Sequence, residues 1–347
     1  HKTTPDKVEL PHVNLISGVI VSESSDEKSF IAPILASNLV EGKDADTPAL
    51  SDLSERDKPW DKHRTNCDTT ANYYKGSEFN RYAERMNECS GLLDFRLVPE
   101  AKDGAYRLKL AAARFCRVRH CPVCQWRKSL MWKAKAYKIL PGVIQEYPTC
   151  RWLFVTLTVK NCEITQLRDT LTWMNKGFKR MSELKVFPAE GYIKTTEVTR
   201  GKNPLGSAHP HFHALMIVKP SYFGVNYLSQ AKWVAMWQKS LRVDYKPILD
   251  VQALKPNDSL VGLLAEVIKY SVKESDLTAD REWFLELTKQ LHRTKAIAVG
   301  GILREYMREL EAEPDDLIGE DNEDEVDEGH LYFGWKRKNK KYKLVGF

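Results

Sequence analysis

The stretch from residue 151 to residue 182 limits the possible folds more than any other part of this chain. Residues 152–159 read Trp-Leu-Phe-Val-Thr-Leu-Thr-Val, and such a run of β-branched, aromatic and aliphatic side chains is typical of a buried strand. Apolar residues then recur every three or four positions, which predicts an amphipathic helix; they are Ile164, Leu167, Leu171, Met174, Phe178 and Met181. The chain therefore joins a strand directly to a helix within one domain.

The order of the strands and helices expected downstream indicates the fold class. Further strands fit residues 190–200, 211–219 and 248–254, and further helices fit residues 229–243 and 259–275. Ser229 is the expected N-cap of the first of these helices, and Asp258 or Ser259 that of the second. The order β-α-β-β-α-β-α is the split βαβ pattern of a ferredoxin-like antiparallel sheet with one extra helix. We therefore expect an α+β fold, with helical C-terminal additions at 280–293 and 296–312.

Two histidines stand two residues apart in the strand expected at 211–219. Side chains at this spacing project from one face of a strand, so His211 and His213 point the same way. A hairpin turn after residue 200 would bring Glu197 of the preceding strand beside them. We therefore predict a divalent metal site formed by His211, His213 and Glu197, suited to Mn2+ or Mg2+ although Zn2+ could occupy it. His209 has the same parity but precedes a proline, so it is the weaker candidate.

Three of the seven cysteines are closely spaced, at Cys116, Cys121 and Cys124. An odd number of cysteines argues against a disulfide framework, whereas a structural Zn2+ needs four tetrahedral ligands. We predict Cys89 as the fourth ligand, because it lies upstream of the expected hairpin. The alternative fourth ligands are Cys67, His63 and His120. Two other interpretations are half-buried thiols without metal, and a redox pair at Cys121 and Cys124, which no thioredoxin-like context supports.

Positive charge is concentrated in the middle of the chain. The formal net charge is only +6, but residues 102–138 hold eleven basic residues against one acidic residue. Basic side chains bind polyanions by releasing counterions from phosphates, so this block predicts a nucleic-acid partner, the alternative being a solvated surface without a ligand. The expected DNA-binding residues are Arg117, Arg119, Arg127, Lys128, Lys133 and Lys135. Four of them belong to a basic helix that should follow Cys124 and end before Pro141.

The helix expected at 259–275 carries three polar residues on one face. Glu266 and Tyr270 are four positions apart, and Tyr270 and Lys273 are three apart, so all three lie together. A phenol with a pKa near 10 is a poor nucleophile until a metal polarises its target and a cation stabilises the phenolate. Taken alone, Tyr270 is one of fourteen tyrosines, and no role follows from its type.

Three motifs, in this order, resemble those of the HUH endonuclease superfamily. Within it, the chain is most similar to the rolling-circle plasmid replication initiators that use a single catalytic tyrosine plus a glutamate. The motifs are Phe154-Val-Thr-Leu-Thr158, His209-Pro-His-Phe-His213 and the helix from Glu266 to Lys273. The segment from Cys116 to Arg127 also resembles the one that precedes the catalytic domain in these proteins. The resemblance covers about residues 85–280.

The resemblance implies a metal-dependent endonuclease and strand transferase. The His/His/Glu site would hold the cation that polarises a scissile phosphate in single-stranded or hairpin origin DNA. Tyr270 would attack to give a 5′-phosphotyrosine intermediate, Lys273 would neutralise the developing charge, and Glu266 would serve the hydrolysis that terminates replication. Thr156 and Thr158 would line the sheet beneath the metal, a weaker assignment. The zinc module would grip DNA, and the implied host partners are a helicase, a polymerase and a single-strand-binding protein.

Two other functions fit parts of this pattern. One is an HUH-type transposase, but those with two nucleophiles carry a second tyrosine where this chain has Glu266. The other is a non-catalytic, zinc-containing DNA-binding regulator in which the histidine pair is structural. Covalent attachment to single-stranded origin DNA separates the regulator from the two enzymes.

These expectations divide the 347 residues into five segments. They are an irregular N-terminal extension at 1–64, a zinc-binding and basic helical DNA-contact module at 65–150, a nicking domain at 151–280, a helical segment at 281–312, and an acidic linker with a basic aromatic tail at 313–347. No apolar run approaches the roughly 20 residues needed to cross a bilayer, and no signal peptide is evident, so we expect a cytoplasmic protein without a membrane partner. The sequence indicates no oligomeric state.

Overall fold

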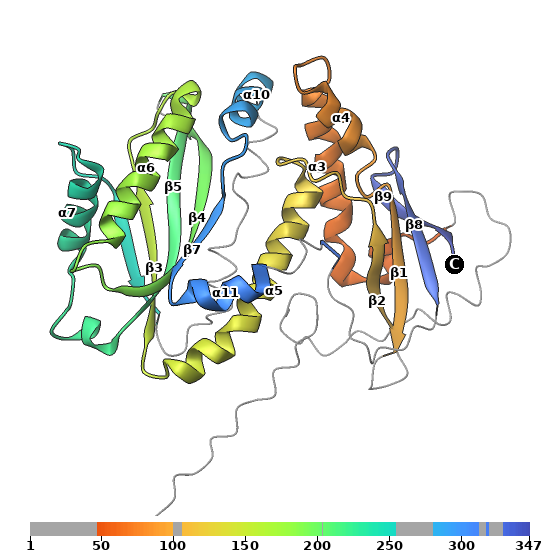
Figure 1. Cartoon of the computed structure of the whole chain (residues 1–347). Coiled ribbons are helices and arrows are strands. Elements are labelled where there is room, and N and C mark those ends of the chain that lie inside the picture. Colours follow the sequence, from red (N-terminus) through yellow and green to blue (C-terminus); the bar gives the residue numbers. More distant parts are fainter. Residues whose placement is uncertain (1–46, 100–105, 203, 255–279, 312–316, 319–328) are drawn as a thin grey trace, which may run out of the picture.

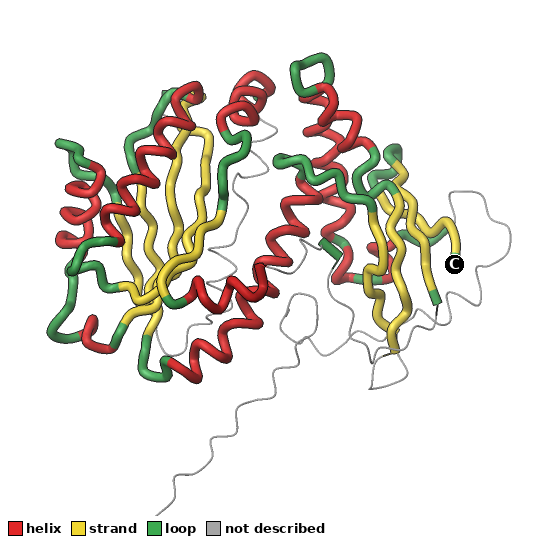
Figure 2. Tube along the Cα trace, viewed as in Figure 1, coloured by secondary structure: helices red, strands yellow, loops and turns green. Residues whose placement is uncertain are grey.

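The computed structural model describes residues 47–99, 106–202, 204–254, 280–311, 317–318 and 329–347. They form two antiparallel sheets with helices packed around them, so the α+β class is confirmed (Figure 1). A long helix, α5 (Pro122–Glu146), runs between the two sheets, as the tube in Figure 2 also shows. None of the helices within these ranges is long and apolar enough to cross a membrane.

The larger sheet has five strands in the order β6-β3-β5-β4-β7, and every neighbouring pair is antiparallel. The strands are β3 (Arg151–Thr158), β4 (Ala189–Lys202), β5 (Leu205–Val218), β6 (Leu249–Ala253) and β7 (Ile297–Gly301). Helix α6 (Leu167–Ser182) connects β3 to β4, and α7 (Gln230–Leu241) connects β5 to β6. The order β-α-β-β-α-β expected between residues 151 and 254 is therefore confirmed. Ser229 caps α7 as predicted, since its side chain accepts a hydrogen bond from the Lys232 amide.

The two faces of this sheet are covered by different elements. Phe212 of β5 points toward α6, where its ring lies 6.2 Å from that of Phe178. Leu215 and Ile217 point the other way, into a second apolar cluster formed with residues of α5 and with Leu303. Because side chains alternate along a strand, His211 and His213 share this second face. The sequence pattern at β5 thus separates a core face from a face that carries polar groups.

Strand β7 corrects the helix expected at 296–312. Residues 297–301 pair with β4, and helix α11 (Leu303–Glu311) begins only after them. Two glycines permit the pairing: a Cβ at Gly300 would meet the Tyr192 ring at 2.3 Å, and Gly301 has a φ of +61°. Glycine tolerates both the close approach and the left-handed backbone. Helix α10 (Arg281–Gln290) matches the helix expected at 280–293.

Helix α5 continues past Pro141, which corrects its expected end. Proline lacks an N–H and removes one hydrogen bond from a helix interior, a cost of roughly 3 kcal/mol. On either side of it, Leu140 and Val143 are buried against the five-stranded sheet. This tertiary contact holds the last turns in place, so packing outweighs the local preference.

The smaller sheet is built from both halves of the chain. Its order is β2-β1-β8-β9, with strands β1 (Leu92–Pro99), β2 (Tyr106–Ala113), β8 (His330–Lys336) and β9 (Lys341–Gly346). Leu331, Phe333 and Tyr342 are buried. The basic aromatic tail expected at 313–347 is therefore wrong for residues 330–346, whose alternating apolar side chains complete a sheet.

The helices beside the smaller sheet correct the irregular N-terminal extension expected at residues 1–64. Helices α3 (Pro59–Tyr74) and α4 (Asn80–Asn87) pack together beside it (Figure 1). The short α2 (Leu50–Leu53) and the 3-10 turn η1 (Glu55–Asp57) precede them. Trp60 of α3 is buried between the rings of Trp126 and Tyr342. The boundary expected at residue 64 falls inside α3, so residues 47–64 belong to the folded unit. Two further 3-10 turns, η2 (Ile164–Gln166) and η3 (Pro220–Phe223), lie beside the larger sheet.

Candidate functional site

Glu197, His211 and His213 come together on the larger sheet. Glu197 of β4 lies directly opposite His211 of β5 in the antiparallel register, and His213 is the next residue on the same face. The Glu197 Oε2 atom is 3.2 Å from His211 Nε2 and 3.0 Å from His213 Nε2. Residues opposite one another in an antiparallel pair have Cβ atoms about 4.5–5.5 Å apart, and diagonal neighbours are within reach of long side chains, so the strand register brings the group together. The structure thus places the three residues as the sequence predicted.

The second ring nitrogen of each histidine is held by the sheet itself. His211 Nδ1 lies 3.2 Å from the His209 carbonyl oxygen, and a carbonyl can only accept, so this nitrogen is the donor. His213 Nδ1 lies 3.1 Å from the Thr156 hydroxyl. Partners of this kind fix the ring orientation of metal-binding histidines and leave Nε2 free to ligate. Thr156 therefore has a definite place beneath the site, whereas the Thr158 hydroxyl donates to the Ile248 carbonyl.

The carboxylate of this group stays ionised. Burial raises the pKa of Glu197, but hydrogen bonds and charge from His211 and His213 outweigh it and hold the pKa well below its usual range. One carboxylate oxygen and two imidazole nitrogens can bind a divalent cation and leave positions for water or phosphate oxygens. His209 lies next to this group, with its Nδ1 2.7 Å from Asn161 Oδ1. Asn161 is a neighbour that no sequence periodicity indicates.

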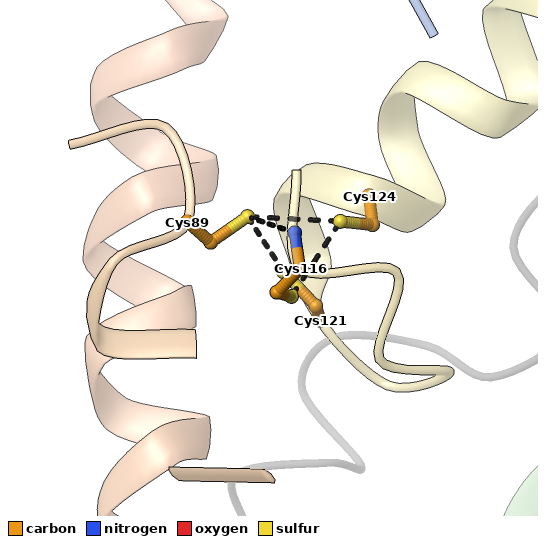
Figure 3. A group of neighbouring side chains, drawn as sticks. All are labelled: Cys89, Cys116, Cys121 and Cys124. Atoms are coloured by element: carbon orange, nitrogen blue, oxygen red, sulfur yellow. Dashed lines mark hydrogen bonds between the residues drawn. The ribbon is translucent and has the colours of Figure 1, made fainter. Parts of the chain in front are cut away.

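Four cysteines form a second group, drawn in Figure 3. Cys89 follows α4, Cys116 follows β2, Cys121 is the N-cap of α5, and Cys124 lies in its first turn. The Sγ atoms of Cys89 and Cys121, of Cys89 and Cys124, and of Cys116 and Cys124 are each 3.6 Å apart. Zn–S bonds of about 2.3 Å in a tetrahedron give S···S edges of roughly 3.8 Å, so the arrangement fits a zinc ion.

Backbone geometry supports the four sulfurs. Arg117 has a left-handed backbone with a φ of +53°, which turns the chain between Cys116 and Cys121. The amides of Arg117 and Val118 point at Cys124 Sγ and Cys116 Sγ, at 3.3 and 3.5 Å. Such amides stabilise thiolates, the form of cysteine that binds metal.

The structure separates Cys89 from the alternative fourth ligands. Only Cys67 lies near the group, with its Sγ 3.5 Å from Cys121 Sγ. His63 stacks on the Trp126 ring, and His120 is buried 5.8 Å from the Phe284 ring. Burial, assisted by the charge of Arg119, lowers the pKa of His120 to about 3, so its ring is neutral. The four thiols whose sulfurs converge are Cys89, Cys116, Cys121 and Cys124.

The predicted DNA-binding residues are not equivalent. The Arg119 guanidinium donates to the Thr294 carbonyl, and that of Arg127 donates to the carbonyls of Leu317 and Ile318. These contacts give both arginines a part in tertiary packing. Lys135 is buried and Lys133 half-buried, whereas Arg117 and Lys128 are exposed. Among the six, the two exposed side chains are the best placed to meet a phosphate backbone.

The expected nucleophile helix at 259–275 lies outside the described residues. Tyr270, Glu266 and Lys273 therefore have no position relative to the metal-binding group. Their assignment continues to rest on their spacing and on the resemblance.

The fold and the two groups define an α+β protein with four converging thiols and a separate carboxylate-imidazole group, each of which could hold a metal ion. A family of proteins described as replication protein matches residues 107–343. This match extends well past residue 280, where the resemblance seen in the sequence ended, and includes strand β8 and the first half of β9.

Relatives agree with this match. The chain is 36% identical over 285 residues to "Protein rep" of Lactiplantibacillus plantarum, an alignment that covers 77% of this chain and 87% of the relative. It is 33% identical over 293 residues to "Protein rep" of Lentilactobacillus hilgardii, covering 79% and 90%. No solved structure matches the chain at a significant level. The chain belongs to the rolling-circle plasmid replication proteins, a class that acts on origin DNA.

Proposed function

We propose that this replication protein cuts one strand of its origin DNA and remains covalently attached to the 5′ end. The observation that carries the proposal is the convergence of Glu197, His211 and His213 on one sheet face. These three donors would hold Mn2+ or Mg2+, and the bound ion would polarise the scissile phosphate and offset its charge. A structural zinc at the four cysteines would be separate from this chemistry.

The proposed nucleophile is the phenol of Tyr270. Its oxygen attacks the scissile phosphorus in line, an O–P bond forms, and the bond from phosphorus to the 3′ oxygen breaks. The phenol loses its proton to solvent and the 3′ oxygen takes one up, which leaves a 5′-phosphotyrosine and a 3′-OH that a polymerase can extend. Lys273, three residues further along the sequence, would stabilise the phenolate.

The proposed role of Glu266 is in termination. It would accept a proton from a water molecule that attacks the phosphorus of the regenerated junction, while the bond to the 3′ oxygen breaks again. Hydrolysis in place of a second tyrosine attack releases the strands after one round. This glutamate therefore favours a replication protein over an HUH-type transposase with two tyrosines.

The zinc-centred unit would hold the DNA. Arg117 and Lys128 would contact the phosphate backbone, which positions the strand without reading its sequence. A helicase, a polymerase and a single-strand-binding protein of the host would act on the DNA that the nick exposes.

The test of nicking uses the full chain, a single-stranded origin hairpin and Mn2+, followed by a denaturing gel. The wild-type protein should give a covalent protein–DNA adduct, and Tyr270→Phe should reduce the adduct at least 1,000-fold because it lacks the attacking oxygen. Tyr227→Phe, at an exposed tyrosine, is the matched control and should react normally. An undiminished adduct with Tyr270→Phe would refute the assigned nucleophile, and no adduct with the wild type would favour the non-catalytic regulator.

A second experiment separates termination from nicking. Glu266→Ala should form the adduct at a rate close to wild type but fail to release the finished strand from a substrate that carries two origin sites. Normal release by this variant would remove the role given to Glu266 and leave that of Tyr270 intact.

A further inference from the structure

A cavity of about 240 Å³ lies on the other face of the larger sheet. It is enclosed by α6, by β4 and by the chain leading into β7. Lys194 and Thr196 reach it from β4, and because they alternate with Glu197 they face away from the metal-binding group. The cavity therefore belongs to neither of the two sites described above.

Lys194 is the central polar group of this cavity. Its side chain is 5% exposed, and its Nζ atom donates to Asn175 Oδ1 at 2.9 Å and lies 3.6 Å from the centre of the Phe212 ring. Burial lowers the pKa of this amine to about 7. Within the part of the chain that the structure describes, no carboxylate pairs with Lys194 and none lines the cavity. A buried cation without a counterion is costly, unless a ligand supplies the opposite charge.

Two further cations border the same space. The Arg168 guanidinium is fixed because its Nη2 atom donates to the carbonyls of Lys289 and His292, at 3.0 and 2.9 Å. This leaves its other N–H groups for a ligand. Lys295 is exposed at the rim. Three basic side chains and no acidic one therefore line this cavity.

The hydroxyls of the cavity differ in what they can offer. Thr172 donates to the Arg168 carbonyl and Thr294 donates to the Leu291 carbonyl, so their protons are engaged. The Thr196 hydroxyl has no hydrogen-bond partner among the described residues and remains available as a donor. Leu171 and Ala298 supply an apolar wall beside these polar groups.

We propose that this cavity binds the phosphate group of a single nucleotide, with Lys194 as its central cation and Arg168, Lys295 and Thr196 as further contacts. Arginine and lysine together suit a phosphate dianion, which can accept hydrogen bonds on three oxygens. At about 240 Å³ the cavity is smaller than the roughly 300 Å³ at which pockets for drug-sized ligands begin, so it would take the phosphate end of one nucleotide and not a length of strand. The nucleotide can be free or the 5′-phosphorylated end of a strand, since both present the same phosphate.

The test measures binding to the full chain by isothermal titration calorimetry. Deoxyadenosine 5′-monophosphate should bind, and deoxyadenosine, which lacks the phosphate, should bind at least tenfold more weakly. Lys194→Met should weaken nucleotide binding at least tenfold, and Lys295→Ala about threefold because this amine is exposed. Lys179→Met, at an exposed lysine of α6, is the control and should bind as the wild type does.

Several outcomes decide against the site. Absence of nucleotide binding by the wild type, or equal binding by Lys194→Met, overturns it. If circular dichroism shows that Lys194→Met does not fold, Thr196→Val and Lys295→Ala carry the test, and unchanged nucleotide binding in both also overturns the site.

Competition by a 5′-phosphorylated oligonucleotide identifies a strand end as the ligand, and competition by free nucleotide alone identifies the free form. Equal competition by an unphosphorylated oligonucleotide contradicts the assignment of phosphate. Nicking plays no part in this experiment, so it is independent of the function proposed above.

Discussion

The two groups of this protein that could hold a metal ion are assembled in opposite ways. The four cysteines come from three separate segments, and backbone amides around Arg117 orient their sulfurs. Glu197, His211 and His213 instead lie on two paired strands whose hydrogen-bonded register already aligns them. The cysteine group links segments that are distant in the sequence, whereas the other group lies on a sheet whose strands pair without it. Removing metal should therefore unfold the cysteine unit, but it should leave the larger sheet folded and only abolish the metal-dependent activity.

The largest expected effect is on the cysteine group. Cys121→Ser removes a ligand at the start of α5, and structural zinc contributes on the order of 10 kcal/mol in small zinc modules. We expect Tm to fall by more than about 10 °C and bound zinc to disappear, as measured by circular dichroism and elemental analysis. A strong zinc chelator should produce the same fall in the wild type.

Cys67→Ser is the matched control, because the Cys67 thiol lies beside Cys121 and Cys89 but outside the set of four whose sulfurs converge. It should keep one equivalent of zinc and change Tm by only a few degrees. Loss of zinc from Cys67→Ser but not from Cys89→Ser would mean that Cys67, and not Cys89, is the fourth zinc ligand.

The next effect concerns the histidines. His213→Ala removes one of three ligands from a preformed sheet, so Mn2+ affinity should fall at least 100-fold while Tm changes little. Electron paramagnetic resonance of free Mn2+ gives the affinity. His209→Ala should retain affinity within about threefold, because its ring is bonded to Asn161 and lies outside the ligand set. A large fall in Tm with His213→Ala would show that the sheet depends on this group, and the contrast with the cysteines would be lost.

A smaller change tests the support of the histidine ring. Thr156→Val removes the hydroxyl beside His213 Nδ1, and the loss of such a partner costs about 10-fold in metal affinity. Thr158→Val makes the same change of side-chain shape two residues further along β3, but the hydroxyl that it removes donates to the Ile248 carbonyl. It should therefore lower stability by about 1 kcal/mol without altering Mn2+ affinity. Equal effects of the two variants on affinity would argue against a special role for Thr156.

The smallest effect lies on the opposite face of β4. The pKa of Lys194 is about 7 in the folded chain and near 10.4 when unfolded, so between these values the unfolded state binds more protons. Stability should then rise with pH in this window, and the wild type should gain on the order of 1 kcal/mol relative to Lys194→Met between pH 7 and pH 9. Urea denaturation at the two pH values measures the difference. A constant difference would mean that Lys194 is charged throughout.

Local signals predicted the larger sheet well. The alternation around Phe212 set which side chains of β5 face the core, and the same alternation placed His211 and His213 beside Glu197. Both facts depend on neighbouring residues within one hairpin. The spacing of Cys116, Cys121 and Cys124 was equally local, whereas Cys89 was chosen because it lies upstream of the expected hairpin.

Long-range packing explains what the sequence did not predict. The pairing of β1 with β8 joins residues more than two hundred positions apart, and no local pattern indicates such a partner. Pro141 stays within α5 because a distant sheet covers its neighbours, and Gly300 matters only because the Tyr192 ring occupies the space a side chain would need. Lys194 was missed for a similar reason, since a single lysine in a strand gives no sign that it will be enclosed.

Strands β8 and β9 also determine the order in which the two sheets can fold during synthesis. Tyr342 of β9 bonds to Ser90, the residue after Cys89, through both the hydroxyl and the carbonyl of that serine. A ribosome delivers β3 to β7 before it delivers these two strands, so the sheet bearing the histidines can fold while the cysteine unit still lacks half of its own. The unit that we expect to bind DNA would be the last to mature, and a nascent chain would acquire the sheet bearing Glu197, His211 and His213 before it.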